Sequence, residues 1–409
     1  MYQRLITSNL LSALDDTPVI LVNGARQTGK TTLVQSVGDG RSARYISLDD
    51  TGFLAAVKAD PSGFIAGLSG PTIIDEVQRA PELFPAIKMS VDRDRTPGRF
   101  LLTGSANVML VPRLSESLAG RMEILTLWPL AQAEVEGLGP GIVDTLYGNV
   151  IPSISGAIPR TELLSRVIAG GYPEPLARTT EARRRAWFNS YITTILQRDV
   201  RDIANIEGLT EMPRLLSLLA TRSANLLNTS EISRAIGIPN TTLSRYMSLL
   251  QATFLVSLLP AWSANLGKRL VRSPKLLVND TGLIASLLGL NAIRLEEVGP
   301  LFGQLLETFV VMEVIKDAGA SQTQPGLFHF RTQAGVEVDL LLEDAAGRIV
   351  GIEVKSSSTV ASSDFRGLRE LAEVTGDRFH RGIVIYTGES VIPFGERLHA
   401  VPVQALWNG

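Results

Sequence analysis

The chain has 409 residues, 45% of them hydrophobic, which is enough for two or three domains with buried cores. It carries 39 basic and 41 acidic residues, so its net charge of −2 does not by itself call for a nucleic-acid partner. It contains no cysteine and only three histidines, which excludes disulfides and thiolate metal sites and argues against zinc.

Residues 1–16 mix apolar and polar side chains as a short amphipathic helix does, rather than as a basic head followed by an apolar core. We therefore expect no signal peptide. The longest apolar stretches are interrupted by polar pairs such as Asn279 and Asp280, so we expect no membrane span. A reducing cytoplasm is the location that fits a chain without cysteine.

The apolar run at 18–22 leads into the string GARQTGKT at 24–31, which matches the phosphate-binding pattern GxxxxGK[ST]. A glycine-bracketed turn lets backbone N–H groups point at phosphates, and the following helix presents its positive end to them. Lys30 would reach the β- and γ-phosphates, and the hydroxyl of Thr31 would bind Mg²⁺. The predicted nucleotide-binding residues of this loop are Gly24, Ala25, Arg26, Gln27, Thr28, Gly29, Lys30, Thr31 and Thr32.

A second buried strand over 71–74 ends in Asp75 and Glu76, which is the Walker B pattern. Asp75 would hold Mg²⁺ through water, and Glu76 would polarise the attacking water. An acidic pair after a strand can also be a helix cap or a solvated turn, but its place after the loop motif favours the nucleotide role. We therefore predict ATP and Mg²⁺ as cofactors, with Lys30 and Glu76 as catalytic residues.

A third strand over 99–103 is followed by small polar residues that could contact the γ-phosphate. The candidates are Thr103, Ser105 and Asn107. For each of them, a turn of small residues that caps the strand is an equally open alternative.

Hydrolysis also needs positive charge on the developing phosphate oxygens, often from an arginine of a neighbouring subunit. Arg121 is the first candidate for this role and Arg113 the second, and for both a surface or structural role stays open. An arginine supplied in trans would require a homo-oligomer.

Residues 1 to about 135 alternate strand-like and helical stretches, which predicts an α/β core with a parallel sheet, helices on both faces, and the ligand at the carboxyl ends of the strands. A tract rich in glycine and proline at 137–159 is typical of a linker or surface excursion. From 162 to about 206 the apolar spacing is helical and predicts a helical lid, with a long amphipathic helix that contains residues 183–192. Its arginine run at 183–185 could contact phosphates or form a solvated face.

A helix-turn-helix pattern follows, in which Ser230 would cap a short helix, Gly237 would mark the turn and Asn240 would open the second helix. Strands at 254–259 and 275–278 could add a two-stranded wing. Residue types that reach DNA edges or phosphates lie on the second helix and around the wing tip: Thr241, Thr242, Ser244, Arg245, Lys268, Arg269, Arg272 and Lys275. A purely structural or protein-binding winged helix remains an alternative.

The last third of the chain predicts a helix with Glu307, strands at 327–331, 336–342 and 349–355, a helix near 364–374, and a strand at 383–386. Side chains alternate along a strand, so Asp339 and Glu353 can meet across a hairpin, with Lys355 on the same face as Glu353. A helical glutamate, then Asp, then Glu-x-Lys is the arrangement of the PD-(D/E)XK nuclease fold. Asp339 and Glu353 would bind Mg²⁺, Glu307 would complete the set, and Lys355 would orient water. A merely solvated charged strand, or a member that binds nucleic acid without cutting, stays open.

Together the strings GARQTGKT, PTIIDE, LLTGSAN, SLAGR, GGYPEPL, KLLVNDTGL, VEVD and IEVKSS resemble the prokaryotic AAA-type ATPases that carry a C-terminal DUF4143 region. The resemblance covers nearly the whole chain. It implies an AAA-type P-loop NTPase core, a helical lid, a winged helix-turn-helix and a restriction-endonuclease-like α/β domain. The corresponding ranges are 1–136, 137–206, 207–295 and 296–409.

Two hypotheses follow for the function. In the first, a cytoplasmic Mg²⁺-dependent ATPase acts on DNA, with branched or broken DNA as a plausible substrate because the C-terminal region resembles junction-resolving nucleases. In the second, a nucleotide-controlled switch docks protein partners, with a catalytically inactive nuclease-like scaffold.

Overall fold

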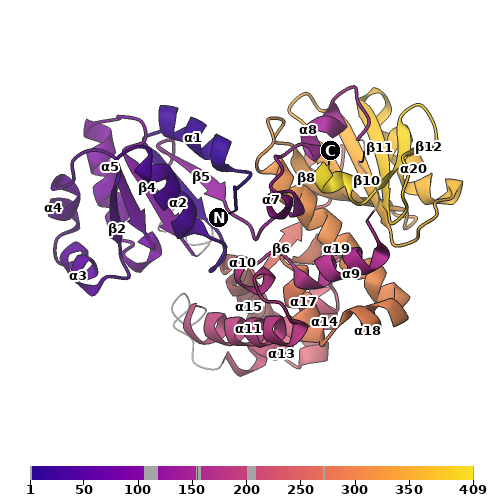
Figure 1. Cartoon of the computed structure of the whole chain (residues 1–409), viewed down its shortest axis with the longest axis horizontal. Helices are drawn as coiled ribbons and strands as arrows, with labels where there is room; N and C mark the ends of the chain where they lie inside the picture. Colours follow the sequence, from indigo (N-terminus) through magenta and orange to yellow (C-terminus); the bar gives the residue numbers. More distant parts are fainter. Residues whose placement is uncertain are drawn as a thin grey trace. The chain divides into compact units, whose positions relative to one another are not determined.

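The computed structural model describes residues 2–105, 118–152, 154, 158–199, 209–269 and 272–408. The chain forms two compact units (Figure 1). The first consists mainly of Gln3–Pro129 with Ser248–Leu255, and the second of Leu130–Met247 with Val256–Gly409. In the described part of the chain, no helix is both long and apolar enough to cross a membrane.

The first unit is built around a five-stranded sheet in which every pairing is parallel. In sheet order its strands are β2 (Arg44–Ser47), β3 (Thr72–Asp75), β4 (Phe100–Gly104), β1 (Val19–Asn23) and β5 (Met122–Thr126). Its helices are α1 (Thr7–Asp16), α2 (Lys30–Asp39), α3 (Thr51–Ala59), α4 (Pro61–Ala66) and α5 (Leu83–Arg93). The predicted parallel sheet is therefore confirmed.

Burial of the central strand explains its unbroken apolar sequence. All five residues of β1 are buried, as expected for a parallel strand covered on both faces. Val19 and Leu21 share one buried cluster with Phe84 and Ile87 of α5, and α2 packs against β1, β2, β3 and β4. Because the strands run in parallel, their carboxyl ends, and the loops that follow them, gather at one edge of the sheet.

The second unit begins with short helices. Those in the described residues are α7 (Gln132–Glu136), α8 (Ile142–Tyr147), α9 (Arg160–Ala169), α10 (Pro173–Leu176), α11 (Glu181–Thr194), α13 (Met212–Ala220), α14 (Thr229–Ile236), α15 (Asn240–Ala252), α16 (Leu266–Arg269), α17 (Thr281–Leu288), α18 (Ala292–Glu297) and the long α19 (Gly299–Ala318). The last five residues of α15 belong to the first unit. Between α15 and α17 the strands β6 (Val256–Leu259) and β7 (Lys275–Val278) pair antiparallel.

The helical segment predicted from 162 to about 206 is divided at the string GGYP, which separates α9 from α10 and α11. The helix predicted around the arginine run is α11, and residues 200–206 lie outside the described residues. Gly170 has φ of +68°, which ends α9, and the prolines at 173 and 175 start the short α10. A Cβ on Gly170 would lie 2.3 Å from Oδ1 of Asp280. Asp280 is buried and accepts from the N–H groups of Gly171, at 2.7 Å, and Leu283, at 2.9 Å. The strings GGYPEPL and KLLVNDTGL thus form one buried junction.

The helix-turn-helix segment differs from the prediction at its first residue. Asn228 rather than Ser230 caps α14, accepting from the backbone N–H of Glu231 at 3.1 Å. Gly237 ends α14 with φ of +81°, and α15 opens at Asn240, as predicted.

The carboxyl-terminal sheet of this unit has six strands and mixed directions (Figure 1). In sheet order they are β12 (Ile392–Pro393), β13 (Leu398–Pro402), β11 (Phe379–Tyr386), β10 (Ile349–Lys355), β9 (Glu337–Glu343) and β8 (Gly326–Arg331). The helices α19 and α20 (Arg366–Thr375) pack against β9 and β10. The sequence did not predict β12, β13 and the final helix α21 (Ala405–Asn408).

Buried carboxylates of α19 hold α7 and the beginning of the tract predicted as a linker. Glu313 accepts from the N–H of Gln132 at 2.6 Å, and Asp317 accepts from those of Gly141 and Val143 at 2.9 and 2.8 Å. These carboxylates pair the N–H groups at the starts of α7 and α8, which have no partner within their own helices.

Candidate functional site

The loop at 24–29 joins β1 to α2 at the carboxyl edge of the parallel sheet. Gly24 has φ of +146°, and a Cβ there would lie 2.2 Å from the carbonyl oxygen of Leu127. Gly29 has φ of +93° immediately before the helix begins at Lys30. The two glycines of the motif therefore serve a close backbone approach and a left-handed turn, which side chains disfavour.

Arg4 supports this loop from the amino-terminal segment. Its guanidinium donates to the carbonyl of Thr28 at 2.6 Å and to that of Trp128 at 2.7 Å, and the residue is buried. No motif surrounds Arg4 in the sequence, so this contact was not predicted. It ties the middle of the loop to the segment that follows β5.

Lys30 lies folded over the loop. Its ammonium donates to the carbonyl oxygens of Gly24 and Ala25 at 2.9 and 2.8 Å, and the residue is buried. The charge is thus held directly above the backbone that would surround the phosphates. Thr28 closes the loop by donating from its hydroxyl to the carbonyl of Ala25 at 3.0 Å.

Thr31 and Asp75 meet at this edge of the sheet. The hydroxyl of Thr31 donates to the two carboxylate oxygens of Asp75 at 3.0 and 3.2 Å. Thr103 at the end of β4 also donates to Asp75, and Tyr45 of β2 donates to it at 2.8 Å. Hydroxyl and carboxylate oxygens are the ligands that Mg²⁺ takes alongside phosphate and water, so this donor set fits the ion. When bound, Mg²⁺ would neutralise negative charge on the phosphates.

Tyr45 was not predicted as part of this site. Partial burial, and then its hydrogen bond to Asp75, raise the pKa of Tyr45 to about 12. The phenol therefore stays protonated at neutral pH and remains a donor to the carboxylate.

Glu76 follows directly at the end of β3 with φ of +60°. Its backbone N–H donates to the hydroxyl of Thr103 at 3.0 Å. The Glu76 carboxylate accepts from the amide of Gln78 and, at 3.0 Å, from the hydroxyl of Ser105. Since β4 lies between β3 and β1, Thr103 and Ser105 lie between the Walker B residues and the loop. Asn107 and Arg113 lie outside the described residues.

Arg121 lies at the amino-terminal ends of the strands, opposite the carboxyl ends where the phosphate loop lies. It precedes β5, whose first residue Met122 pairs with Val19, whereas the phosphate loop follows Asn23 at the far end of β1. Four residues of strand separate the two ends by about 13 Å. Arg121 forms an ion pair with Asp92 at 2.6 Å. It therefore cannot serve the nucleotide site of its own chain.

A second constellation lies in the carboxyl-terminal sheet. The β9–β10 pairing matches Leu340 with Ile352, so that Asp339 and Glu353 are the next residues along the two strands. Lys355 donates to Glu353 at 2.9 Å, and the backbone N–H of Val354 donates to Asp339 at 2.9 Å. The predicted residues of this region are thus brought together.

Lys275 is the unpredicted member of this cluster. The sequence suggested a place in an exposed basic patch at the wing tip, which is wrong, because Lys275 is only 3% exposed. Its ammonium lies 2.6 Å from Glu307 and 3.0 Å from Asp339. We define the acidic cluster as Glu307, Asp339 and Glu353 together with Lys275 and Lys355.

The carboxyl groups of the acidic cluster are electrostatically unequal. Burial, reinforced by the charge of Asp339, raises the pKa of Glu307 to about 8 and that of Glu353 to about 7. Burial also opposes ionisation of Asp339, but the Lys275 ammonium and the Val354 N–H outweigh it and hold the pKa of that carboxyl below its usual range. The two carboxylates in turn raise the pKa of Lys275, against the effect of burial.

The other predicted DNA-contacting residues fall into two groups. Thr241 and Arg245 are exposed on α15. Arg269 instead donates to both carboxylate oxygens of Glu343, at 2.6 and 3.2 Å, and Arg272 donates to the carbonyl of Arg331 at 3.1 Å. The side chain of Lys268 lies outside the part that the structure describes.

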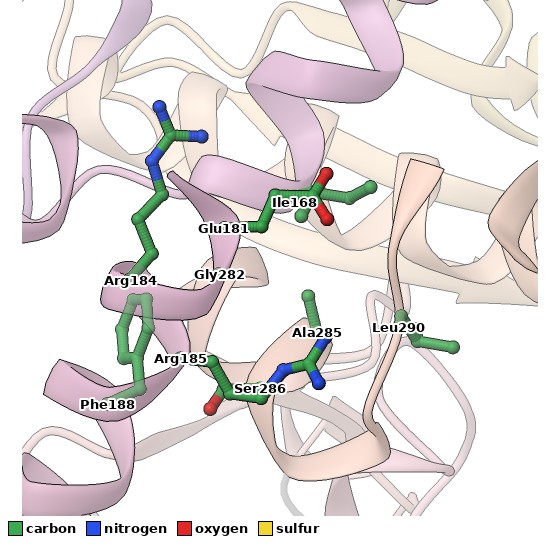
Figure 2. Close-up of a pocket in the computed structure, with 9 residues that line it drawn as sticks. All are labelled: Ile168, Glu181, Arg184, Arg185, Phe188, Gly282, Ala285, Ser286 and Leu290. Atoms are coloured by element: carbon green, nitrogen blue, oxygen red, sulfur yellow. The ribbon is translucent and has the colours of Figure 1, made fainter. Parts of the chain in front are cut away.

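The arginine run at 183–185 does not form a converging anion site. Figure 2 shows the guanidinium groups of Arg184 and Arg185 pointing in different directions beside a small pocket between α9, α11 and α17. Arg184 donates to the carbonyl of Arg178 at 3.0 Å. The pocket volume of about 20 Å³ has room for a water molecule and not for a nucleotide.

Models of three known domain families match successive parts of the chain. An AAA domain matches residues 16–136, the domain of unknown function DUF8612 matches 160–294, and the domain of unknown function DUF4143 matches 302–406.

Among solved structures, the Walker-type ATPase PABY2304 of Pyrococcus abyssi is 16% identical, with a TM-score of 0.42, and the match covers 70% of this chain and 96% of that one. The RuvB Holliday junction branch migration motor of Thermotoga maritima is 19% identical, with a TM-score of 0.30, covering 63% and 89% respectively. Both scores are too low to carry an argument about function.

Two mycobacterial relatives are similar over almost the entire chain. The proteins named uncharacterized protein Rv2008c, of Mycobacterium tuberculosis, and uncharacterized protein Mb2031c, of Mycobacterium bovis, are each 35% identical over 405 residues, which is 99% of this chain and 84% of the relative. The chain therefore belongs to the family of these two proteins, and it combines an AAA domain with a DUF4143 domain.

Proposed function

We propose that this chain binds ATP with Mg²⁺ and hydrolyses its γ-phosphate. The observation that carries the proposal is the hydrogen bond between Thr31 and Asp75, beside a lysine held over a glycine-bracketed loop. Phosphoryl transfer needs positioned charge more than covalent chemistry. Backbone N–H groups, Lys30 and the cation held by Thr31 and Asp75 supply that charge.

In this proposal Glu76 orients and polarises the attacking water. Ser105 and Gln78 hold its carboxylate, so both act as positioning residues. An arginine on the transferred phosphate completes the reaction. Because Arg121 lies at the far edge of the sheet, we propose it as a finger only in a homo-oligomer, where it would act on the nucleotide of a neighbouring copy.

We further propose that ATP hydrolysis acts on DNA bound to the second unit. The support is the pair α14 and α15, joined by a turn at Gly237 and followed by the two strands β6 and β7, which is the element order of a winged helix. Thr241 and Arg245 are exposed on the second helix of the pair, where a recognition helix carries its contacts.

The carboxyl-terminal sheet supports a nuclease-like scaffold in the same proposal. A helical glutamate and two strand carboxylates gather there with Lys355, in the order typical of PD-(D/E)XK proteins. Such a scaffold could recognise branched or broken DNA. Cutting of DNA is not part of the proposed function.

A second candidate function is favoured by the bonds of Arg269. Its guanidinium is held by Glu343 and lies over the rings of Trp262 and Phe328, at 5.3 and 4.9 Å. Together with the buried Lys275, this leaves the wing with less positive charge that could contact phosphates. The alternative is a nucleotide-controlled switch that docks protein partners.

Phosphate release with Mg²⁺ and ATP tests both functions, measured with and without linear, single-stranded and four-way DNA. The DNA-coupled ATPase predicts stimulation that Arg245→Ala abolishes and that Lys30→Ala removes together with basal turnover. Arg366→Ala, which removes an exposed arginine of α20, is the matched control and should behave as the wild type. Turnover that no DNA changes, with no salt-sensitive DNA binding, would favour the protein-docking switch.

A further inference from the structure

A nuclease-like fold implies a divalent cation at the acidic cluster, so the donor atoms of this cluster decide whether the ion fits. Asp339 accepts from Lys275 through Oδ1 and from the N–H of Val354 through Oδ2. Glu307 accepts from Lys275 and Glu353 from Lys355, each through Oε1. Among the residues with described positions, no group of three His, Cys, Asp or Glu side chains is arranged to hold a metal ion.

Lys275 is fixed in this cluster by its backbone as well as by its charge. In β7 it pairs with Leu259 of β6, and it also forms a bridge with Leu226 on its other side. The neighbouring Leu276 donates to the carbonyl of Asn225 at 2.9 Å. The Cα of Lys275 is therefore held between two chain segments. Lys275 does not lie on a loop whose movement could carry the ammonium out of the cluster.

Charge also opposes a divalent ion at this position. Mg²⁺ requires carboxylate oxygens at about 2.0–2.1 Å in near-octahedral geometry. An ion bound to Asp339 would lie close to the ammonium of Lys275, and the two like charges would repel in a buried setting. Displacing the ammonium would leave a charge without its partners in the interior, which is costly.

We infer that Lys275 is the built-in cation of the acidic cluster, in the place where a nuclease would carry a divalent metal. The cluster then joins β7 to α19 and β9 as an ion-pair junction, and the carboxyl-terminal sheet does not cut nucleic acid by a metal-dependent reaction. This inference rests on the nuclease-like scaffold of the proposed function and does not depend on ATP hydrolysis.

Binding of Mn²⁺ to the full chain without nucleotide tests the inference, with bound and free ion separated by electron paramagnetic resonance. Any Mn²⁺ held near Thr31 and Asp75 is common to all variants, so differences between variants report on the acidic cluster. The wild type and Glu353→Gln should bind the same amount of Mn²⁺ up to 1 mM, on the order of the weakest affinities that a protein site shows. A site in the wild type that Glu353→Gln removes would overturn the inference.

Removal of Lys275 is the variant in which the inference predicts a gain of metal binding. Lys275→Met should gain a Mn²⁺ site that the additional change Glu353→Gln removes, because the carboxylates then lack their cation. Its unfolding temperature in EDTA should be lower than that of the wild type by roughly 5–15 °C. A Lys275→Met protein as stable as the wild type would contradict the role of Lys275 as the cation of the cluster.

Lys316→Met is the matched control for this experiment. Lys316 is also a buried lysine of the second unit, bonded to Glu313 at 2.7 Å and to the carbonyl of Leu130 at 2.9 Å. Its loss should lower stability without creating a Mn²⁺ site. If Lys275→Met does not fold, the Mn²⁺ binding of the wild type and of Glu353→Gln still tests the inference. DNA cleavage by the same two proteins is a second test. DNA fragments made by the wild type and not by Glu353→Gln would overturn the inference.

Discussion

The hydroxyl of Thr31 lies 3.0 Å from the carboxylate of Asp75, although the two residues belong to different strand–loop connections. The parallel β1 and β3 end at the same edge of the sheet and bring them together. Thr103 and Tyr45 donate to the same carboxylate, so three hydroxyl groups orient one acid.

Replacing Lys30 by alanine should lower ATP hydrolysis by roughly 100-fold or more, because the ammonium would no longer stabilise the charge that develops on the transferred phosphate. Phosphate release at saturating Mg²⁺ measures the effect. Lys58→Ala, at an exposed position of α3, should leave the rate unchanged. Equal rates for Lys30→Ala and the wild type would exclude this loop as the catalytic site.

Glu76→Gln should lower kcat by roughly 100-fold while ATP still binds, since the amide cannot polarise water as a carboxylate does. Ser105→Ala should lower kcat several-fold with little change in KM, because it removes one of the two donors that orient Glu76. Single-turnover kinetics and nucleotide-binding titrations separate the two parameters. A Ser105→Ala enzyme that changes only KM would argue against a positioning role for Ser105.

Tyr45→Phe should raise the Mg²⁺ concentration needed for half-maximal hydrolysis several-fold, because Asp75 loses a neutral donor that orients it. At saturating Mg²⁺ the rate should approach that of the wild type. The raised pKa of Tyr45, about 12, means that the phenol donates throughout the range from pH 6 to 10, so the variant should not alter the pH profile there. An unchanged Mg²⁺ requirement would show that Tyr45 does not support the site.

The second unit should lose stability as pH rises from about 5 to 8. The folded-state pKa values of Glu353 and Glu307, about 7 and 8, lie above the ordinary value of 4.5, so the folded chain binds more protons than the unfolded chain in this range. The stabilisation from their protonated forms is complete below the ordinary value and is lost as pH rises through the folded values. The free energy of unfolding that is lost between pH 5 and 8 should be smaller in Glu353→Gln than in the wild type, by on the order of 1–3 kcal/mol.

Urea unfolding of wild type and Glu353→Gln at several pH values measures this effect. Asp317, whose pKa burial raises to about 6, contributes a slope in the same direction, so the variant should retain part of the dependence. Identical slopes for the two proteins would show that Glu353 does not titrate in this range.

Gly170→Ala should destabilise the second unit by more than about 2 kcal/mol, because the backbone there, with φ of +68° and ψ of −158°, is one that essentially only glycine adopts, and a steric clash adds to that cost. The added Cβ would lie 2.3 Å from the Asp280 carboxylate, which cannot move without losing its bonds to Gly171 and Leu283. Gly237→Ala is the comparison, because that glycine lies in the less costly left-handed helical region, with φ of +81° and ψ of +28°, and no atom lies within 4 Å of the added Cβ, so only about 1 kcal/mol should be lost. Thermal unfolding of both variants measures the difference, and equal losses would exclude the clash.

The sequence by itself determined the parts of this protein that depend on local pattern. The loop at 24–31, the buried strands that precede it and Asp75, and the turn at Gly237 are encoded in a few consecutive residues, because strand burial and left-handed turns restrict residue types locally. The order of strands and carboxylates in the last third of the chain was likewise predictable from the period of two in strands.

Tertiary structure decided what each isolated charged residue does. Lys275 appears in the sequence as one cation among several at a wing tip, and only the packing of β7 beside α19 and β9 turns it into the counter-ion of Asp339 and a hydrogen-bond donor to Glu307. Because β5 runs parallel to β1, Arg121 lies at the amino-terminal ends of the strands, away from the phosphate loop. Local composition cannot encode these outcomes, because the partner of a charge is set by contacts between residues far apart in the chain, through strand register and burial.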